Sequence, residues 1–366
     1  MKAFPSVRIF GGPSRYVQGP DALDVLGELA APYGAAPLVI GDETVIEMLG
    51  ARLDAILTRA GLEPVFRSLR GEITREAIAL LADAGTPGEI GLVIGVGGGK
   101  SLDAAKGVAM GLGAPVFTVP TIASNDSPTS AAVAIYDEDH VMVAIDRMPR
   151  NPDVVLVDTA IIAAAPTAFL RAGIGDAIAK RFEAEACLAG HGVTPFATRP
   201  LRTALAIADC CYRTLRARSE AALEAADRAE VTEDLEAVVE ATVLMSGLAF
   251  ENGGLSLAHS LTRGLTRARG ARDASHGDQV AWATLVHLAA DGRSDDELPD
   301  LIGFYRRIGL PTRLADLGMT APTADEIMEI ARWTMTAPHL SNFATPIDQE
   351  AVSAAILRAE AIAAQP

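Results

Sequence analysis

The sequence predicts an α/β domain built on a parallel sheet, followed by a second domain made of helices. In the first part, short apolar runs alternate with stretches of helical periodicity, which is typical of strands joined by crossover helices. After about residue 163 strand patterns nearly disappear, and one helical pattern follows another. A chain of 366 residues is long enough for two domains. We expect these domains to span residues 1–162 and 163–366.

Five apolar runs predict the strands of the first domain. They cover residues 36–45, 63–69, 89–97, 114–121 and 154–157. Helical periodicity over residues 45–61 and 74–85 predicts helices between the first three strands. In the second domain, residues 232–250 and 353–365 carry the same helical signal. Parallel strands connected in this way require helices on both faces of the sheet.

Composition limits the classes of protein to which the chain can belong. Hydrophobic residues make up 49% of the sequence and charged residues 21%, which provides apolar mass for large cores. The apolar runs are too short to span a membrane, and we expect no secretion signal in the first ten residues. A formal net charge of −16 argues against a nucleic-acid partner. Three cysteines do not form a disulfide framework, so we expect a cytoplasmic location.

A glycine-rich stretch, "GVGGGKSLDAAK" at residues 95–106, follows one of the predicted strands. Its spacing differs by one residue from a phosphate loop, and the G-x-G-x-x-G pattern fails as well. The glycines still let the backbone approach a ligand, and the following helix start favours an anion such as a pyrophosphate. The alternative is a tight turn without a ligand. Asp103 and Lys106 are expected to form only a surface contact.

Asp42 lies in the turn with which the apolar run at residues 36–45 ends, just past the strand itself. A carboxylate at this place can accept hydrogen bonds from the adenosine ribose of a dinucleotide, and it would repel a 2′-phosphate. This interpretation favours NAD over NADP. The alternative is that Asp42 caps the helix that follows it.

The stretch "TVPTIASNDSPTSAAVAIY" at residues 118–136 adds a distinctive pattern. Together with the glycine-rich stretch, it resembles the glycerol dehydrogenase branch of the iron-containing (group III) alcohol dehydrogenases. The similarity continues through "AGIGDAIAKRFEAEAC", "SGLAFENGGLSLAHSLTRGL" and "SHGDQVAWATL", and it covers residues from about 8 to 320. It implies a Rossmann-like parallel sheet and a helical second domain, which is the architecture shared with dehydroquinate synthase.

The resemblance implies roles for the matching residues of the first domain, with NAD as the cofactor. Asp42 would hold the adenine ribose, and Asp126 would lie beside the substrate hydroxyls. The other cofactor-binding positions are Gly97, Gly98, Gly99, Lys100, Ser101, Thr121, Ile122, Ala123, Ser124, Ser130, Ala132 and Tyr136.

In the second domain, Asp176, His259 and His276 match the metal ligands of the family. Their spacing alone does not indicate a site, because each could instead be a cap, a core histidine or a loop histidine. One carboxylate and two imidazoles leave positions open on a divalent ion, as in catalytic zinc sites. The same donors also suit ferrous iron; the resemblance favours zinc. With Asp126, these ligands form the implied catalytic set.

The implied activity is oxidation of a small polyol, glycerol to dihydroxyacetone, by hydride transfer to NAD from an alcohol whose acidity the metal increases. Alternatives are a related hydroxy-acid or sn-glycerol-1-phosphate dehydrogenase, and a non-catalytic NAD-binding protein. The resemblance also implies an assembly of identical subunits, with an octamer as one option.

Some positions depart from the family pattern. Thr262 and Arg181 stand where close members carry histidine and tryptophan. Arg263, Arg267, Arg269 and Arg272 lie between the predicted ligands His259 and His276. They suggest an anionic substrate, and the alternative is a solvated loop or a contact between subunits.

Overall fold

The computed structural model describes residues 7–83, 90–138, 142–293 and 295–365. It contains two compact units. An α/β unit comprises Gly11–Thr167 and Ala225–Leu244, and a helical unit comprises the other described residues. The end of the helix predicted for residues 74–85 and the start of the strand predicted for 89–97 lie outside the described residues. A single domain boundary between residues 162 and 163 stays a prediction. In the structure, residues 225–244 group with the α/β unit although they follow that boundary in the sequence.

The α/β unit is built on a parallel sheet, as the sequence predicts. Six strands pair in the order β1-β8-β5-β4-β2-β3, and all of these pairs are parallel. The elements of the unit are β1 (Arg15–Gly19), α1 (Leu26–Ala30), β2 (Pro37–Asp42), α2 (Glu43–Arg59), β3 (Val65–Leu69), α3 (Arg75–Ala82), β4 (Leu92–Gly97), α4 (Gly99–Leu112), β5 (Val116–Pro120), β6 (Ala132–Tyr136), β7 (Met142–Arg147), β8 (Val154–Asp158), α5 (Thr159–Ala164) and α8 (Glu233–Glu240).

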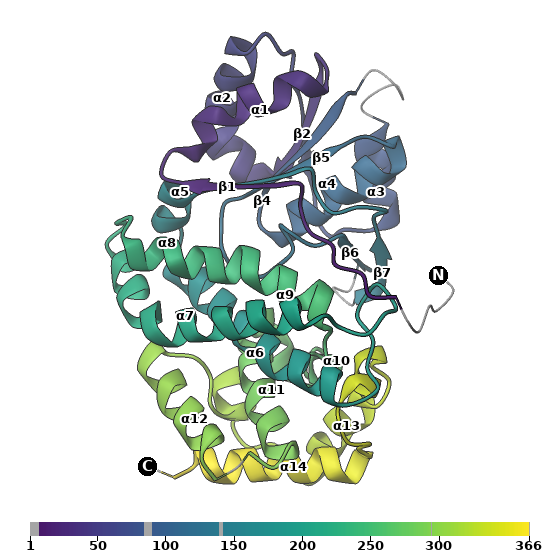
Figure 1. Cartoon of the computed structure of the whole chain (residues 1–366), viewed down its shortest axis with the longest axis vertical. Helices are drawn as coiled ribbons and strands as arrows, with labels where there is room; N and C mark the ends of the chain where they lie inside the picture. Colours follow the sequence, from purple (N-terminus) through teal and green to yellow (C-terminus); the bar gives the residue numbers. More distant parts are fainter. Residues whose placement is uncertain (1–6, 84–89, 139–141, 294, 366) are drawn as a thin grey trace. The chain divides into compact units, whose positions relative to one another are not determined.

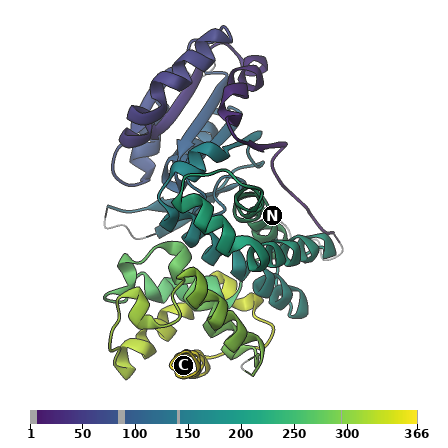
Figure 2. The ribbon, with the colours of Figure 1, turned by 90° about the vertical axis from the view of Figure 1, so that its left-hand side faces the viewer.

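Helices cover both faces of this sheet (Figure 1, Figure 2). Val39 belongs to the core that α1 and α2 complete on one face. Its neighbour Leu38 belongs to the core that α3 and α4 complete on the other face. Successive strand residues point to opposite faces, so covering both faces produces the continuous apolar runs that revealed the strands.

Strands β1, β6 and β7 were not predicted. In β7 four of the six side chains are exposed, and the strand pairs with β6 in a separate antiparallel sheet. β1 is an edge strand that pairs with β8, and its side chains are only partly buried. Apart from Val133 and Ile135 in β6, no side chain of these three strands is fully buried, so their sequence signal is weak.

The helical unit confirms the prediction that helices dominate the second part of the chain. Its elements are α6 (Thr167–Ala189), α7 (Arg202–Asp227), α9 (Ser246–Gly253), α10 (Leu257–Leu265), α11 (His276–Ala290), α12 (Glu297–Ile308), α13 (Ala324–Thr334) and α14 (Gln349–Ala363). Helix α10 packs against α11 and α13, and α14 packs against the same two helices. Among the described residues, no helix combines the length and the apolar character that crossing a membrane requires.

The helix predicted for residues 232–250 is divided in the structure. A π-helical turn at Ala241–Met245 separates α8 from α9. The carbonyl oxygen of Val243 in this turn accepts a hydrogen bond from the Thr129 hydroxyl at 3.1 Å. A widened turn frees carbonyl groups from the regular helical ladder. Here one of them is used to bind the segment that precedes β6.

Candidate active site

The carboxyl ends of β2 and β4 mark the point where the strand order of the sheet reverses. After β2 the chain continues to β3 on one side, and it then returns to form β4 on the other side. Open parallel sheets bind their ligands at the carboxyl ends of the strands beside such a reversal. Asp42 ends β2 and Gly97 ends β4. Two predicted cofactor residues therefore lie at the edge where this fold binds ligands.

The turn after β4 has the conformation that its glycines allow. Gly97 has a φ of +134°, which side chains rarely tolerate. Gly98 caps α4 without a side-chain hydrogen bond to the helix. Ser101 is buried in the first turn of α4, where its hydroxyl accepts from the Asp42 N–H at 3.1 Å. The backbone N–H groups at this helix start, rather than the Ser101 hydroxyl, are the groups that suit an anion.

Asp42 is a helix cap, which is the alternative that the sequence left open. Its Oδ1 accepts from the Val45 N–H at 2.9 Å, which satisfies a free donor at the start of α2. Its Oδ2 accepts from the Ser101 hydroxyl at 3.3 Å. A capping carboxylate keeps lone pairs for further donors, so a ribose contact stays a prediction compatible with this geometry.

Protein side chains also contact the glycine turn. Lys100 forms an ion pair with the buried carboxylate of Glu72. A Cβ on Gly98 would lie 3.0 Å from the Ile122 side chain, and one on Gly99 would lie 2.8 Å from the Asn125 side chain. The absence of side chains at Gly98 and Gly99 therefore allows the segment after β5 to pack against the turn, whether or not a ligand also binds there.

The expectation of a surface contact between Asp103 and Lys106 was wrong. Both side chains are buried, and the Lys106 ammonium lies 2.7 Å from Asp103 Oδ1. Lys106 also donates to the carbonyl oxygens of Ser127, Ser130 and Ala132 at 2.9, 3.2 and 2.6 Å. A buried ammonium needs a full set of acceptors. It finds them in the backbone between β5 and β6 and thereby fixes that segment against α4.

The remaining residues predicted to contact the cofactor or the substrate also lie in the α/β unit. Residues 121–124 follow β5, and the Thr121 N–H donates to the Gly97 carbonyl oxygen at 3.1 Å. The carbonyl oxygen of Asp126 accepts from the Thr129 hydroxyl at 3.2 Å. Tyr136 ends β6, where burial and then the charges of Asp103 and Glu72 raise the pKa of its hydroxyl to about 12. Ser130 and Ala132 are tied to Lys106, as described above.

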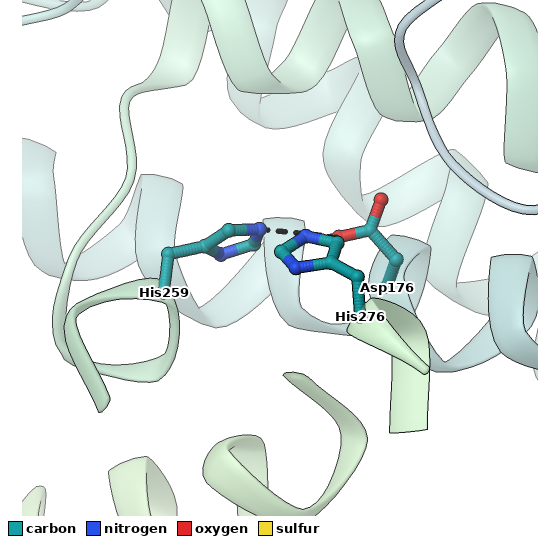
Figure 3. A group of neighbouring side chains, drawn as sticks. All are labelled: Asp176, His259 and His276. Atoms are coloured by element: carbon teal, nitrogen blue, oxygen red, sulfur yellow. Dashed lines mark hydrogen bonds and ion pairs between the residues drawn. The ribbon is translucent and has the colours of Figure 1, made fainter. Parts of the chain in front are cut away.

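In the helical unit, three elements bring the predicted metal ligands together. Asp176 lies in α6, His259 in α10, and His276 is the first residue of α11. One ligand atom from each lies within 4.8 Å of the other two. Asp176 Oδ1 is 3.1 Å from His259 Nε2 and 3.7 Å from His276 Nε2. Figure 3 shows the two imidazoles and the carboxylate directed toward one another.

Two glycines allow α6 and the start of α11 to approach closely enough for this arrangement. A Cβ on Gly277 would lie 1.8 Å from the carbonyl oxygen of Ala172. A Cβ on Gly175 would lie 2.6 Å from the carbonyl oxygen of Gly277. Any side chain at either position would separate the two backbones. Because Gly175 precedes Asp176 and Gly277 follows His276, that separation would move the two candidate ligands apart.

Glu183 supports His259 from behind. Its Oε2 lies 2.6 Å from His259 Nδ1, which leaves Nε2 directed toward Asp176. Its Oε1 accepts from the backbone N–H groups of Ser256 and His259 at 2.7 and 3.0 Å. A carboxylate behind a histidine is the usual way in which proteins orient a metal-binding imidazole. Glu183 also stabilises the start of α10, where it satisfies free backbone donors.

A lysine completes the cluster. The side chain of Lys180 is buried, and its ammonium lies 2.6 Å from Asp176 Oδ1. The same nitrogen lies 3.2 Å from His259 Nε2. Burial by itself raises the pKa of Asp176, but the charge of Lys180 and the hydrogen bond from His259 outweigh it and hold the pKa well below its usual range. The pKa of Glu183 is likewise lowered to about 2, because the charges of His259 and Lys180 outweigh its burial.

These donors fit a divalent ion. One carboxylate oxygen and two imidazole nitrogens lie close enough to bind one ion, and the partial exposure of His276 leaves one side of the group open. Lys180 and Glu183 were missed by the sequence analysis. They follow Asp176 by four and seven residues on a helix, so one face of α6 carries all three charges. Charged residues at this spacing within an otherwise apolar helix were the signal that could have indicated Lys180 and Glu183.

The four arginines between His259 and His276 make contacts elsewhere. Their partners are α13, the residues that follow it, and an adjacent aspartate. Arg263 donates to the Thr336 carbonyl at 2.9 Å, Arg267 lies 4.3 Å over the Trp333 ring, Arg269 is 3.8 Å from Glu326, and Arg272 is 3.7 Å from Asp273. These contacts favour the solvated-loop alternative over a site for an anionic substrate.

The two positions that depart from the family pattern also have partners. The Thr262 hydroxyl donates to the His259 carbonyl oxygen at 2.7 Å. The Arg181 guanidinium stacks 4.5 Å from the Tyr212 ring and bonds to Glu185 at 3.1 Å. The Thr262 contact thus lies within α10, and the Arg181 contacts lie within α6 and against α7.

Comparison with known proteins places the chain in a family. Residues 13–159 match the model of the iron-containing alcohol dehydrogenases. The chain is 38% identical to a glycolaldehyde reductase of Halobacterium salinarum, over 88% of each chain. It is 35% identical to a glycerol dehydrogenase of Citrobacter freundii, over 98% of this chain and 99% of that one.

A solved structure gives the same result. The crystal structure of a probable glycerol dehydrogenase from Sinorhizobium meliloti superposes with a TM-score of 0.91 at 36% identity, over 98% of this chain and 100% of that one. Similarity at this level, along nearly the entire length, is carried by both units of the fold. The chain therefore belongs to the iron-containing alcohol dehydrogenase family, in its glycerol dehydrogenase branch.

Proposed function

We propose that the protein is a metal-dependent, NAD-linked dehydrogenase of small polyols, with glycerol and dihydroxyacetone as its substrate pair. The observation that carries the proposal is the convergence of Asp176, His259 and His276, with one ligand atom from each within 4.8 Å of the others. These residues come from three helices, so their meeting is a property of the fold rather than of a local motif. Membership of the family supports the same activity.

Each unit supplies residues for one part of this reaction. In the α/β unit, the N–H groups at the start of α4 would bind the dinucleotide pyrophosphate, and the Asp42 carboxylate would accept from the adenosine ribose. In the helical unit, Asp176, His259 and His276 would hold the ion, and Glu183 keeps the His259 ring oriented through Nδ1. A divalent ion bound there supplies a Lewis acid that increases the acidity of a substrate hydroxyl.

The substrate class is a small compound that carries a hydroxyl beside the reacting carbon. Glycerol dehydrogenases and a glycolaldehyde reductase are about equally similar to this chain. Glycerol and glycolaldehyde both carry a hydroxyl next to the carbon that changes oxidation state. Reduction of glycolaldehyde is therefore a second candidate activity, favoured by the H. salinarum relative. Asp126 is proposed to orient the second hydroxyl of either substrate.

Zinc is the proposed metal. Two imidazoles and one carboxylate with an open position form a common zinc donor set, although ferrous iron accepts the same donors. Histidine binds a metal ion as the neutral imidazole and aspartate as the carboxylate, so each proposed ligand must be deprotonated to bind. An assembly of identical subunits, the lack of a nucleic-acid partner and a cytoplasmic location stay predictions.

The test measures NADH formation and consumption with a panel of small substrates. Metal-depleted protein, reloaded with Zn²⁺ or Fe²⁺, is assayed with glycerol, ethylene glycol, lactate and sn-glycerol-1-phosphate, and in reverse with dihydroxyacetone and glycolaldehyde. We expect turnover of the neutral diols and hydroxycarbonyls that a chelator abolishes. Turnover that persists after complete metal removal, or a preference for the anionic compounds, would contradict the proposal.

A further inference from the structure

Lys180 places a positive charge among the residues that the proposed function assigns to the metal. It follows Asp176 by one helical turn, and its side chain is fully buried. Its ammonium lies 2.6 Å from Asp176 Oδ1 and 3.2 Å from the Asp176 carbonyl oxygen. A third contact, 3.2 Å long, reaches His259 Nε2.

Two of these contacts involve the atoms that a metal ion would use. With His259 Nδ1 bonded to Glu183, Nε2 is the nitrogen left for the ion. Asp176 Oδ1 is the oxygen nearest to both imidazoles. Zinc binds such atoms at about 2.0–2.2 Å. An ion at that distance from Asp176 Oδ1 would have the Lys180 ammonium as a close cationic neighbour.

Such a neighbour affects ion binding in two ways. An ammonium this close repels a divalent cation strongly in a buried site, where water screens charge poorly. It also neutralises the buried Asp176 carboxylate, which would otherwise have only the two imidazoles beside it. The same charge therefore stabilises the fold without the metal and opposes binding of the metal.

Resting on the proposed function, we propose that Lys180 is an internal cation that competes with the divalent ion for Asp176 and His259. The ion then binds more weakly and more reversibly than its three ligands would allow in the absence of Lys180. Lys180 acts through the ligands, so it is a tuning residue for metal binding rather than a catalytic residue.

The experiment compares Lys180→Met with the wild-type protein. Methionine retains an unbranched side chain of similar length and favours helices, but it carries no charge. The dissociation constant of Zn²⁺ is measured on metal-depleted full-length protein by competition with a chromogenic chelator. Co²⁺ absorption provides a second measure that does not depend on activity. The control is Arg181→Met, which removes a neighbouring charge of α6 whose partners are Glu185 and Tyr212.

We expect Lys180→Met to bind Zn²⁺ at least about tenfold more tightly, since a nearby charge commonly shifts ionic equilibria by one to three logarithmic units. We expect Arg181→Met to bind it as the wild type does. Without metal, Lys180→Met should melt at a lower temperature than the wild type. Its rise in melting temperature on addition of Zn²⁺ should be the larger of the two.

The outcomes separate this inference from the proposed function. The His276→Ala variant shows whether Zn²⁺ binds at the proposed site, because it should then lose Zn²⁺ binding. If it does, equal or weaker Zn²⁺ binding by folded Lys180→Met overturns the inference about Lys180 and leaves the proposed function intact. A lower melting temperature without any gain in affinity likewise means that Lys180 has only a structural role. If neither the wild type nor Lys180→Met binds Zn²⁺ or Co²⁺, the inference and the proposed metal site both fail.

Discussion

Two buried Asp–Lys pairs, one in each unit, have the same composition and different surroundings. In the α/β unit, Lys106 is held by Asp103 and by the carbonyl oxygens of residues 127, 130 and 132. In the helical unit, the Lys180 ammonium lies against the Asp176 carboxylate and 3.2 Å from a ring nitrogen of His259. The partners of Lys106 include backbone carbonyls of a packed segment, whereas Asp176 and His259 are the proposed ligands of an ion. The first pair fixes the segment between β5 and β6 against α4, and the second lies in the proposed metal site.

The largest expected effect is loss of the metal site. His276→Ala removes a proposed ligand whose side chain is half exposed, so the fold should be little affected. We expect turnover to fall by about 10³-fold or more, because a metal contributes several kcal/mol to such reactions. NADH formation and bound zinc per chain are the measurements. The control is His191→Ala, which removes an exposed histidine of a loop. If His276→Ala keeps wild-type turnover, the Asp176–Lys180 pair does not belong to a catalytic site.

The second effect concerns the pair in the α/β unit. Lys106→Met leaves Asp103 buried without its cation, which typically lowers the free energy of unfolding by about 3–5 kcal/mol. Denaturant unfolding of the wild type and the variant measures the loss. Added Zn²⁺ should not recover it, in contrast to Lys180→Met. Combining Lys106→Met with Asp103→Asn should recover part of the loss, because no buried charge then remains. A change below about 1 kcal/mol would show that the pair is dispensable.

The third effect tests the carboxylate behind His259. Glu183→Gln keeps the shape of the side chain but weakens its bond to Nδ1, so the ring is held less firmly. Loss of such partners typically weakens metal binding by about 10–100-fold. Chelator competition measures this change, and Glu47→Gln on the exposed side of α2 serves as the control. Unchanged affinity in Glu183→Gln would mean that packing alone orients His259.

The smallest effect is expected at the arginines between His259 and His276. Arg272→Ala removes an exposed side chain whose partner is the adjacent Asp273. Stability should change by less than about 0.5 kcal/mol, and kcat/KM for glycerol and for lactate should stay the same. A selective loss of activity toward lactate would restore the hypothesis of an anionic substrate.

The difference between the pairs also explains which residues the sequence could reveal. Asp103 and Lys106 look like an ordinary helical surface pair, because their burial depends on a segment that packs over them from residues 127–134. Lys180 and Glu183 lie on the same face of α6 as Asp176, and this spacing was visible in the sequence. Their partner His259 lies about 80 residues away, so the sequence did not show that they contact it.

The sequence by itself determined the parallel sheet, the helical second part and the family, because apolar periodicity and contiguous motifs are local properties. Only the tertiary structure decided that Lys106 is buried and that Lys180 lies against Asp176 and His259. The physical reason is distance along the chain. Lys106 is buried only once residues 127–132 pack against α4, and the Lys180 contacts form only once α6 and α10 pack together. No local pattern records which groups will meet.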